Sequence, residues 1–208
     1  FDFWFEYKNA IPKGFIRLQG KLAELSDSGI ELILFTGNHD IWIFDYFTKE
    51  MGIKVYRDPQ QYSIQTSGQI NPMKLYIAHG DGLGPGDRGY KFIKKVFAAK
   101  WSQWMFARMH PNFGIGLANY FSRKSRVATG DSDSKFLGED KEWLVQFCKE
   151  HEKTDPQDYY IFGHRHLPMT IKISERATYI NLGEWLNYNT YAVFDGTETK
   201  LLEWNLNS

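Results

Sequence analysis

The sequence predicts an α/β fold, in which helices cover layers of β-strands. Two observations support this prediction. Short apolar runs that suit buried strands occur at residues 30–36, 75–78 and 159–162, and each is followed by polar residues. Segments with helical spacing of apolar residues lie between these runs, so strand and helix signals alternate along the chain. A chain of 208 residues is long enough for one domain with a substantial core.

The first part of the chain is predicted to alternate between helices and strands. Pro12 suits the first turn of a helix, and Gly52 is a typical residue just beyond the end of another. The run at 30–36 has few charges and is expected to be a central strand covered on both faces. The expected elements are, in order, a helix from Pro12 to Ser28-Gly29, a strand at 30–36, a helix at 41–51, and short strands at 53–56 and 62–65.

Residues 87–134 differ from the rest and are predicted to be a helical insertion, with 1–86 and 135–208 forming the core domain. Residues 87–126 are rich in aromatic side chains and carry nine basic residues against one acidic residue. Because the whole chain has no net charge, the remainder is acidic. The insertion could line a groove for a lipid, or it could be an ordinary helical subdomain with its aromatic residues as core. A polar loop is expected at 129–134.

The last part of the chain is predicted to return to strands after one more helix. That helix is expected to start near Glu139 and to place its apolar residues, from Trp143 to Cys148, on one face. Gly196 indicates a hairpin between the last two strands. The expected strands are residues 159–162, 170–173, 178–182, 191–194 and 200–204.

Composition excludes several classes of protein. The balanced charge gives no general attraction to polyanions, so no nucleic-acid partner is expected. The single cysteine, Cys148, excludes an internal disulfide and fits a reducing compartment. No apolar run reaches the roughly 18 residues of a membrane-spanning helix, and no charged-then-apolar leader opens the chain. No obligate protein partner is predicted.

Potential metal ligands follow the apolar runs. Ligands bind beyond the carboxyl ends of strands in open α/β sheets, and amide oxygens and imidazoles suit Mn, Fe or Zn. A single histidine beside a glycine is more often a turn residue than a ligand, but three such strand ends together favour a metal site. The candidate ligands are Asn38, His79, His164 and His166. His110 and His151 lie in helical contexts and are not included.

These motifs resemble those of a known superfamily. The sequences Gly37-Asn38-His39-Asp40, His79-Gly80-Asp81 and Gly163-His164-Arg165-His166 resemble calcineurin-like metallophosphoesterases. Within them, nearly all of the chain is similar to bacterial UDP-2,3-diacylglucosamine diphosphatases of lipid A synthesis. The insertion carries the most specific likeness, at residues 87–91 and 122–126. The best-known members have arginine after the metal-binding asparagine, whereas this chain has His39, as in the wider superfamily. The resemblance implies a sandwich of two mixed β-sheets flanked by helices, with a helical cap insertion.

The resemblance also implies motifs upstream of Phe1. The superfamily signature begins with Asp-x-His and Gly-Asp blocks, and residues 1–7 are similar to the sequence that directly follows the second block. Asp2 would then be a supporting acid. The bridging aspartate and a strand or two of the sheet would lie before Phe1. The 208 residues alone are therefore expected to hold at most one weakly bound ion and to turn over no substrate.

The resemblance implies two divalent ions, expected to be Mn2+. Asn38, His79 and His164 would hold one ion and His166 the other, while Asp81 would orient His79. His39 would be catalytic and sit beside the phosphate, where it would neutralise charge or protonate the leaving oxygen. A loop residue that satisfies backbone groups is the other interpretation of His39. The implied substrate-binding residues are Asn38, His39, Asp87, Tyr90, Ser125, Arg126, Lys135 and His164.

The implied activity is hydrolysis of the pyrophosphate bond of UDP-2,3-diacylglucosamine, giving UMP and 2,3-diacylglucosamine 1-phosphate, lipid X. The binding partner would be this acylated UDP-sugar. The enzyme would be cytoplasmic and peripheral on the inner face of the membrane. The insertion would bind its acyl chains and anionic groups. Two alternatives stay open. One is a metallophosphoesterase acting on another phosphodiester or nucleotide, and the other is a metal-free binding scaffold on the same fold.

Overall fold

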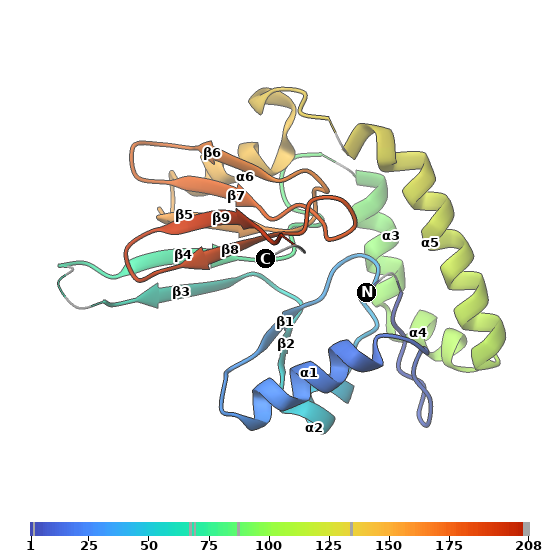
Figure 1. The fold of residues 1–208 in the computed structure, drawn as a ribbon. Coiled ribbons are helices and arrows are strands. Elements are labelled where there is room, and N and C mark those ends of the chain that lie inside the picture. Colours follow the sequence, from blue (N-terminus) through green and yellow to red (C-terminus); the bar gives the residue numbers. More distant parts are fainter. Residues whose placement is uncertain (2, 67, 69, 87, 134, 206–208) are drawn as a thin grey trace. The chain divides into compact units, whose positions relative to one another are not determined.

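The computed structural model describes residues 1, 3–66, 68, 70–86, 88–133 and 135–205, and for residues 88, 90, 123 and 125–133 it describes the backbone alone (Figure 1). The fold is mixed α/β, as predicted. The chain divides into two compact units. The first unit comprises Phe1–Asp58 and Arg88–Ala128, and the second comprises Pro59–Asp87 and Thr129–Ser208. The predicted division into a core and an insertion at 87–134 follows different bounds and stays a prediction.

The first unit is built from helices around a short parallel pair of strands. β1 pairs in parallel with β2, with Ile33 opposite Lys54 and Phe35 opposite Tyr56. Trp4, Ile43 and Phe47 form the buried centre of this unit. Its elements are α1 (Ile16–Asp27), β1 (Ile33–Phe35), α2 (Tyr46–Met51), β2 (Lys54–Tyr56), α3 (Arg88–Ala98), α4 (Lys100–Ala107) and most of α5 (Pro111–Asp133).

Two predictions for this unit were wrong. The run at 30–36 is not a central strand: β1 has three half-buried residues, and β2 is its only partner among the described strands. The pairing is short because β2 begins only at Lys54, beyond the left-handed Gly52 that ends α2. The helix predicted at 41–51 begins only at Tyr46. The Glu6 carboxylate accepts hydrogen bonds from the backbone amides of Asp45 and Tyr46, at 2.8 and 3.1 Å, and so caps the helix there.

The prediction of a polar loop at 129–134 was also wrong, for those of its residues that the structure describes. Helix α5 continues through this stretch to Asp133, and Ser134 lies outside the described residues. Polar composition favours a loop, but a helix already formed adds further residues at low cost when no proline interrupts it.

Among the described residues, no helix combines the length and the apolar character needed to cross a bilayer.

The second unit has a five-stranded mixed sheet at its centre. The strand order is β3-β4-β5-β7-β6, in which β4, β5 and β7 are parallel and the two outer strands are antiparallel to their neighbours. The strands agree with the predicted ones to within two residues at each end. They are β3 (Gln60–Ile64), β4 (Met73–Ile77), β5 (Tyr159–Phe162), β6 (Met169–Lys172) and β7 (Thr178–Asn181).

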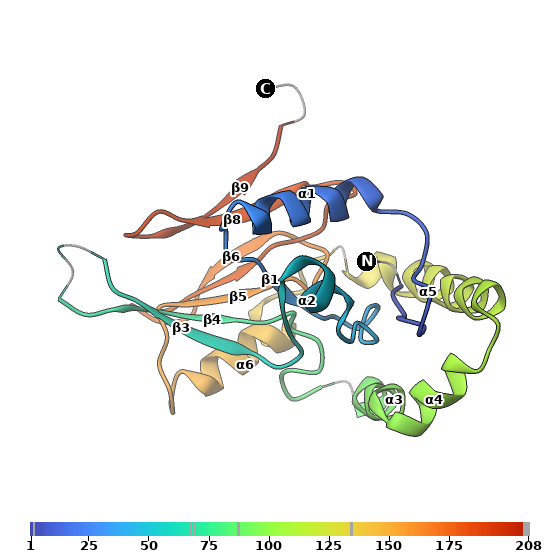
Figure 2. The ribbon, with the colours of Figure 1, turned by 90° about the horizontal axis from the view of Figure 1, so that it is seen from below.

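Both faces of this sheet are covered within the second unit (Figure 2). Helix α6 (Trp143–His151) follows a 3-10 turn at Glu139–Lys141 and packs Leu144, Val145 and Cys148 against one face. The hairpin β8 (Thr190–Phe194) and β9 (Thr199–Glu203) covers the other face with Ala192 and Leu201. Cys148 is a buried free thiol. Burial raises its pKa well above the usual range for a thiol.

Candidate functional site

Two of the predicted ligands, His79 and His164, lie side by side where neighbouring strands end. β4 and β5 are parallel, with Ile77 opposite Ile161, so the residues after each strand emerge at the same edge of the sheet. The carbonyl of His79 accepts hydrogen bonds from the amides of Gly163 and His164, at 3.0 and 2.9 Å. These bonds fix the two backbones next to each other. The imidazole centroids are 5.3 Å apart, and the rings meet edge to face.

Gly80 allows this close approach. Its φ of +109° is a backbone conformation that side chains rarely adopt. A β-carbon at this position would lie 3.2 Å from the β-carbons of His164 and Phe162 and 3.3 Å from a methyl carbon of Leu144. Any other residue would therefore push against the base of the His164 side chain. The glycine after His79 is a geometric requirement of the histidine pair.

The loop that carries His166 is held from one side by an ion pair. Arg165 donates a hydrogen bond to the Glu142 carboxylate at 2.9 Å and another to the carbonyl of Lys135 at 2.9 Å. The side chains of Arg165 and Glu142 are 16 % and 5 % exposed, so the pair is largely shielded from water. Such a pair adds little net stability, because the cost of removing both charges from water offsets much of their attraction. Its main effect is to hold the two side chains in one arrangement. Arg165 therefore sets the path of the loop between His164 and His166.

A buried amide also holds this loop. Asn181, at the end of β7, is completely buried and donates hydrogen bonds to the carbonyls of Arg165 and, at 2.9 Å, Leu167. Those carbonyls flank His166. The loop is thus fixed at the residues immediately before and after this predicted ligand.

Asn38 and His39 lie in the first unit, in the turn that follows β1. The Asp40 carboxylate accepts a hydrogen bond from the amide of Gly37 at 2.5 Å and so closes the turn around them. Asp40 is buried, and this burial raises the pKa of its carboxyl. Nδ1 of His39 lies 2.9 Å from the hydroxyl oxygen of Ser122 on α5. The prediction that Asn38 binds metal together with the histidines of the second unit is not tested by these contacts and stays a prediction.

The donor chemistry of the histidine pair fits a transition metal. Two imidazoles on adjacent, hydrogen-bonded strand ends are typical ligands for Mn, Fe or Zn. In the described part of the chain, no group of three or more His, Cys, Asp or Glu side chains is arranged to hold an ion. Asp81, expected to orient His79, is 7 % exposed. Its role stays a prediction.

Several predicted site residues fall outside what the structure describes. Asp2 and Asp87 lie outside the described residues. For Tyr90 on α3 and for Ser125 and Arg126 on α5, the backbone alone is described. Lys135 is exposed, and its carbonyl is the group that accepts the bond from Arg165.

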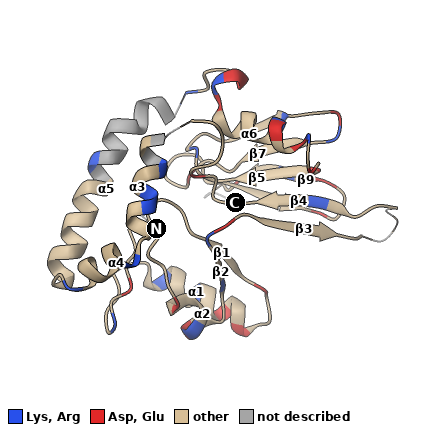
Figure 3. Ribbon diagram, turned by 180° about the vertical axis from the view of Figure 1, so that it is seen from behind, with Lys and Arg blue, Asp and Glu red and all other residues tan. Residues whose placement is uncertain are grey.

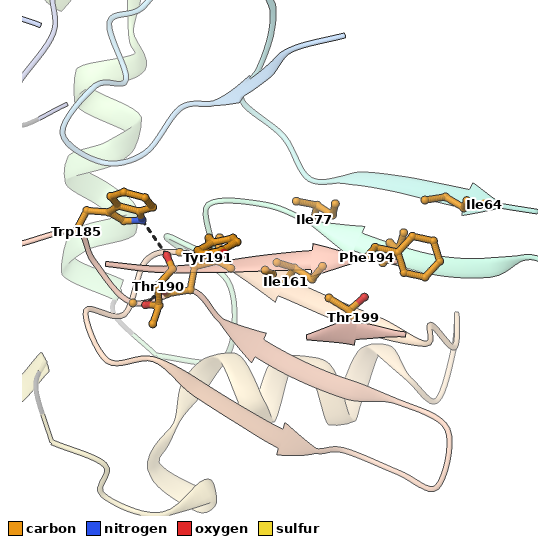
Figure 4. Close-up of a pocket in the computed structure, with 13 residues that line it drawn as sticks. Ile64, Ile77, Ile161, Trp185, Thr190, Tyr191, Phe194 and Thr199 are labelled. Atoms are coloured by element: carbon orange, nitrogen blue, oxygen red, sulfur yellow. Dashed lines mark hydrogen bonds between the residues drawn. The ribbon is translucent and has the colours of Figure 1, made fainter. Parts of the chain in front are cut away.

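A separate cavity of about 540 Å³ lies in the second unit, between the sheet and the β8–β9 hairpin (Figure 4). Ile77, Ile161 and Phe194 are among the side chains that line it, and the Trp185 indole, which also lines it, donates to the carbonyl of Thr190 at 2.8 Å. The described residues of its lining include no histidine, carboxylate, lysine or arginine. The cavity is therefore suited to apolar packing, and the candidate chemistry lies at the strand ends.

Comparisons with known proteins agree with the motifs. No family model matches the chain. A protein of Porphyromonas gingivalis described as UDP-2,3-diacylglucosamine hydrolase is 40 % identical over 98 % of this chain and 79 % of its own length. The chain belongs to the UDP-2,3-diacylglucosamine hydrolase family. Relatives with the same description from Histophilus somni and Aeromonas hydrophila are each 24 % identical, over 89 % and 97 % of this chain and 74 % and 80 % of their own lengths. The predicted resemblance to this family of hydrolases is confirmed.

Sequence reasoning missed three residues that shape the site of this hydrolase family member. Glu142 and Asn181 hold the His164–His166 loop, and Ser122 contacts His39. A signal existed for Asn181, because an amide that ends a buried apolar strand needs hydrogen-bond partners. Glu142 directly before a predicted helix was a weaker signal. A single serine on an aromatic, basic helix gave none.

Replacing Asn181 with alanine is expected to loosen the His166 loop. The variant loses two hydrogen bonds to loop carbonyls, which should lower the free energy of unfolding by about 1–3 kcal/mol. Because His166 is a predicted metal ligand, the looser loop should also weaken Mn2+ binding, by up to the roughly 10- to 100-fold that loss of an outer partner of a ligand costs. Urea denaturation and metal titration measure the two effects. The exposed Asn187 provides a matched alanine control. Wild-type stability of Asn181→Ala would show that the amide does not anchor the loop.

Proposed function

We propose that this protein hydrolyses the pyrophosphate bond of UDP-2,3-diacylglucosamine to UMP and 2,3-diacylglucosamine 1-phosphate, in lipid A biosynthesis. The observation that carries the proposal is the His79–His164 pair at adjacent strand ends, in a chain 40 % identical to a described UDP-2,3-diacylglucosamine hydrolase. Paired imidazoles at the carboxyl edge of a sheet fit metal-assisted attack on a phosphorus centre. The complete set of Asn38, His79, His164 and His166 argues against a metal-free binding scaffold.

The proposed fold is the layered sandwich of the calcineurin-like metallophosphoesterases, and the proposed cofactor is a pair of Mn2+ ions. His79 and His164 would contribute to one ion together with Asn38, and His166 would contribute to the other. When bound, such ions act as Lewis acids that activate water and neutralise phosphate charge. The protein's own contribution is to hold the imidazoles in fixed directions, through the His79 carbonyl, Gly80 and the anchored His166 loop.

His39 is the proposed catalytic residue among the protein's own side chains. Its ring lies in the turn next to Asn38, and Asp40 stabilises that turn. An imidazole at this position can donate a proton or a hydrogen bond to the leaving phosphate oxygen. UMP and the sugar phosphate both leave as anions, so a donor beside the scissile bond lowers the cost of separating them. Asp87, Tyr90, Ser125, Arg126 and Lys135 remain the proposed substrate contacts.

The α3–α5 region is proposed to receive the acyl chains and to rest on the inner face of the membrane. Its aromatic side chains are mostly exposed, whereas a helical subdomain that used them as core would bury them. Lys91, Lys94 and Lys95 add positive charge on α3 (Figure 3), which suits anionic head groups. The aromatic side chains that are 58–69 % exposed in this region are Phe92, Trp101, Trp104, Phe113, Tyr120 and Phe121.

Release of UMP tests the proposed function. Purified protein of full natural length should release UMP from UDP-2,3-diacylglucosamine in the presence of Mn2+ and stop when a chelator is added. UDP-N-acetylglucosamine, which lacks the two long acyl chains, should be a poor substrate. Equal rates on both would favour a phosphoesterase acting on other nucleotides. Absence of metal-dependent hydrolysis of either compound would exclude the proposal.

A further inference from the structure

Helix α5 packs within the first unit through a face of small residues. Gly114, Ala118 and Ser122 recur every four residues and so lie on one side of the helix. Gly114 is buried, and a β-carbon there would overlap the Tyr7 hydroxyl and approach the Phe106 ring. The helix is therefore held in close contact with the body of the unit at Gly114, two turns before Ser122.

At Ser122 this face meets the turn that carries His39. The hydroxyl oxygen of Ser122 lies 2.9 Å from Nδ1 of His39, although the two residues are 83 positions apart in the sequence. Ser122 is 9 % exposed, so water competes little for this bond. A serine hydroxyl can donate to an unprotonated Nδ1 or accept from a protonated one. In either case the bond restrains the rotation of the imidazole.

We propose that Ser122 is a positioning residue for hydrolysis, which donates to Nδ1 of His39 and so fixes the ring orientation with the proton on Nε2. The inference rests on the proposed function, in which His39 acts at the leaving oxygen. In the proposed reaction, Nδ1 bonds to Ser122 and Nε2 is the ring nitrogen that would donate to a phosphate oxygen. This is the same logic by which a third group orients a catalytic histidine in other enzymes. Helix α5 would then orient a catalytic residue as well as contribute to binding of the acyl chains.

Two properties separate this role from simple packing. A packing residue contributes to stability, and its loss lowers activity only in proportion to unfolding. A positioning residue changes turnover of the folded enzyme, because the reacting group spends less time in the productive orientation. Substrate affinity, which depends on other contacts, should change little.

Kinetics of Ser122→Ala provide the first test. The variant should keep a KM within about two-fold of wild type, while kcat falls about 10- to 100-fold, the range seen when an outer partner of a site residue is lost. Ser122→Thr retains the hydroxyl and should recover much of the loss. Ser102→Ala is the matched control, since the Ser102 hydroxyl donates to a helix carbonyl, that of Val96, at 2.6 Å and lies outside the proposed site. In a His39→Ala background, Ser122→Ala should have no further effect on kcat.

Nitrogen NMR of the histidine rings tests the contact without relying on activity. In protein labelled with ¹⁵N-histidine, at one fixed pH, His39 should show a single tautomer in wild type and in Ser102→Ala. Ser122→Ala should shift the His39 Nδ1 resonance toward the averaged position of a solvated imidazole. His39→Asn identifies the signal.

The outcomes distinguish this inference from the proposed function. An active wild type whose Ser122→Ala variant keeps both kcat and the His39 spectrum overturns the inference and leaves the proposed function intact. An inactive wild type of full natural length contradicts the proposed function, while the NMR shift still decides whether Ser122 orients His39. Two results would assign Ser122 to packing. One is a lower melting temperature of Ser122→Ala with unchanged kcat. The other is a fall in kcat that Ser122→Thr does not restore, combined with an unchanged His39 spectrum.

Discussion

In protein of full natural length, replacing His164 with alanine is expected to abolish the proposed metal-dependent hydrolysis. The variant removes one of the two imidazoles that meet at the strand ends, whereas the backbone bond from its amide to the His79 carbonyl can remain. Loss of an outer partner of a metal ligand costs about 10- to 100-fold, so loss of a ligand itself should lower kcat/KM by more than about 100-fold. Mn2+ affinity, measured by calorimetry, should fall in parallel.

His110→Ala is the matched control for this experiment. His110 is exposed, and its Nδ1 accepts a local hydrogen bond from the amide of Asn112 at 3.3 Å. This variant should retain wild-type Mn2+ affinity, and its melting temperature should change little. Full metal binding by His164→Ala would show that the histidine pair is not a metal site.

Replacing Gly80 with alanine is expected to damage the site without removing any of its functional groups. The φ of +109° at this position imposes a strain of about 1–3 kcal/mol on a residue with a β-carbon. The new methyl group would also press against the His164 and Phe162 side chains. We expect a lower melting temperature and, in the folded fraction, Mn2+ binding that is weakened because the two imidazoles are forced apart.

Gly163→Ala is the corresponding control in the same region. A β-carbon at Gly163 would have no neighbouring atom within 4 Å, and its φ is not positive. This variant should fold with near-native stability and bind Mn2+ normally. If Gly80→Ala were equally stable and bound Mn2+ equally well, the tight packing around Gly80 would not define the site.

The site could be predicted where its residues follow directly on a buried strand. His79 and His164 each come after a short apolar run, and parallel pairing then brings the runs together, which is a general property of such sheets. Strands β4 and β5 were predictable for the same reason. Their apolar residues serve both faces of a covered sheet, so each run is continuous and ends sharply at glycine or histidine.

Features that depend on distant contacts were not predictable. The start of α2 is set by Glu6, which is 39 residues before Asp45 in the sequence, so local periodicity placed the helix start too early. The contact between Ser122 and His39 spans 83 residues. A serine or a glutamate has no local pattern that reveals such a partner. Tertiary packing decides these positions, and a single sequence does not encode it in neighbouring residues.

The order of strands in the second unit has a consequence for how the protein opens. β4, β5 and β7 occupy the interior of the sheet, while β3 and β6 form its margins. Transient fraying begins at margins, and interior strands exchange their amide hydrogens only when larger parts of a protein unfold. The histidine pair is thus attached to strands that separate late. Brief loss of order at either margin can occur without disturbing the two imidazoles.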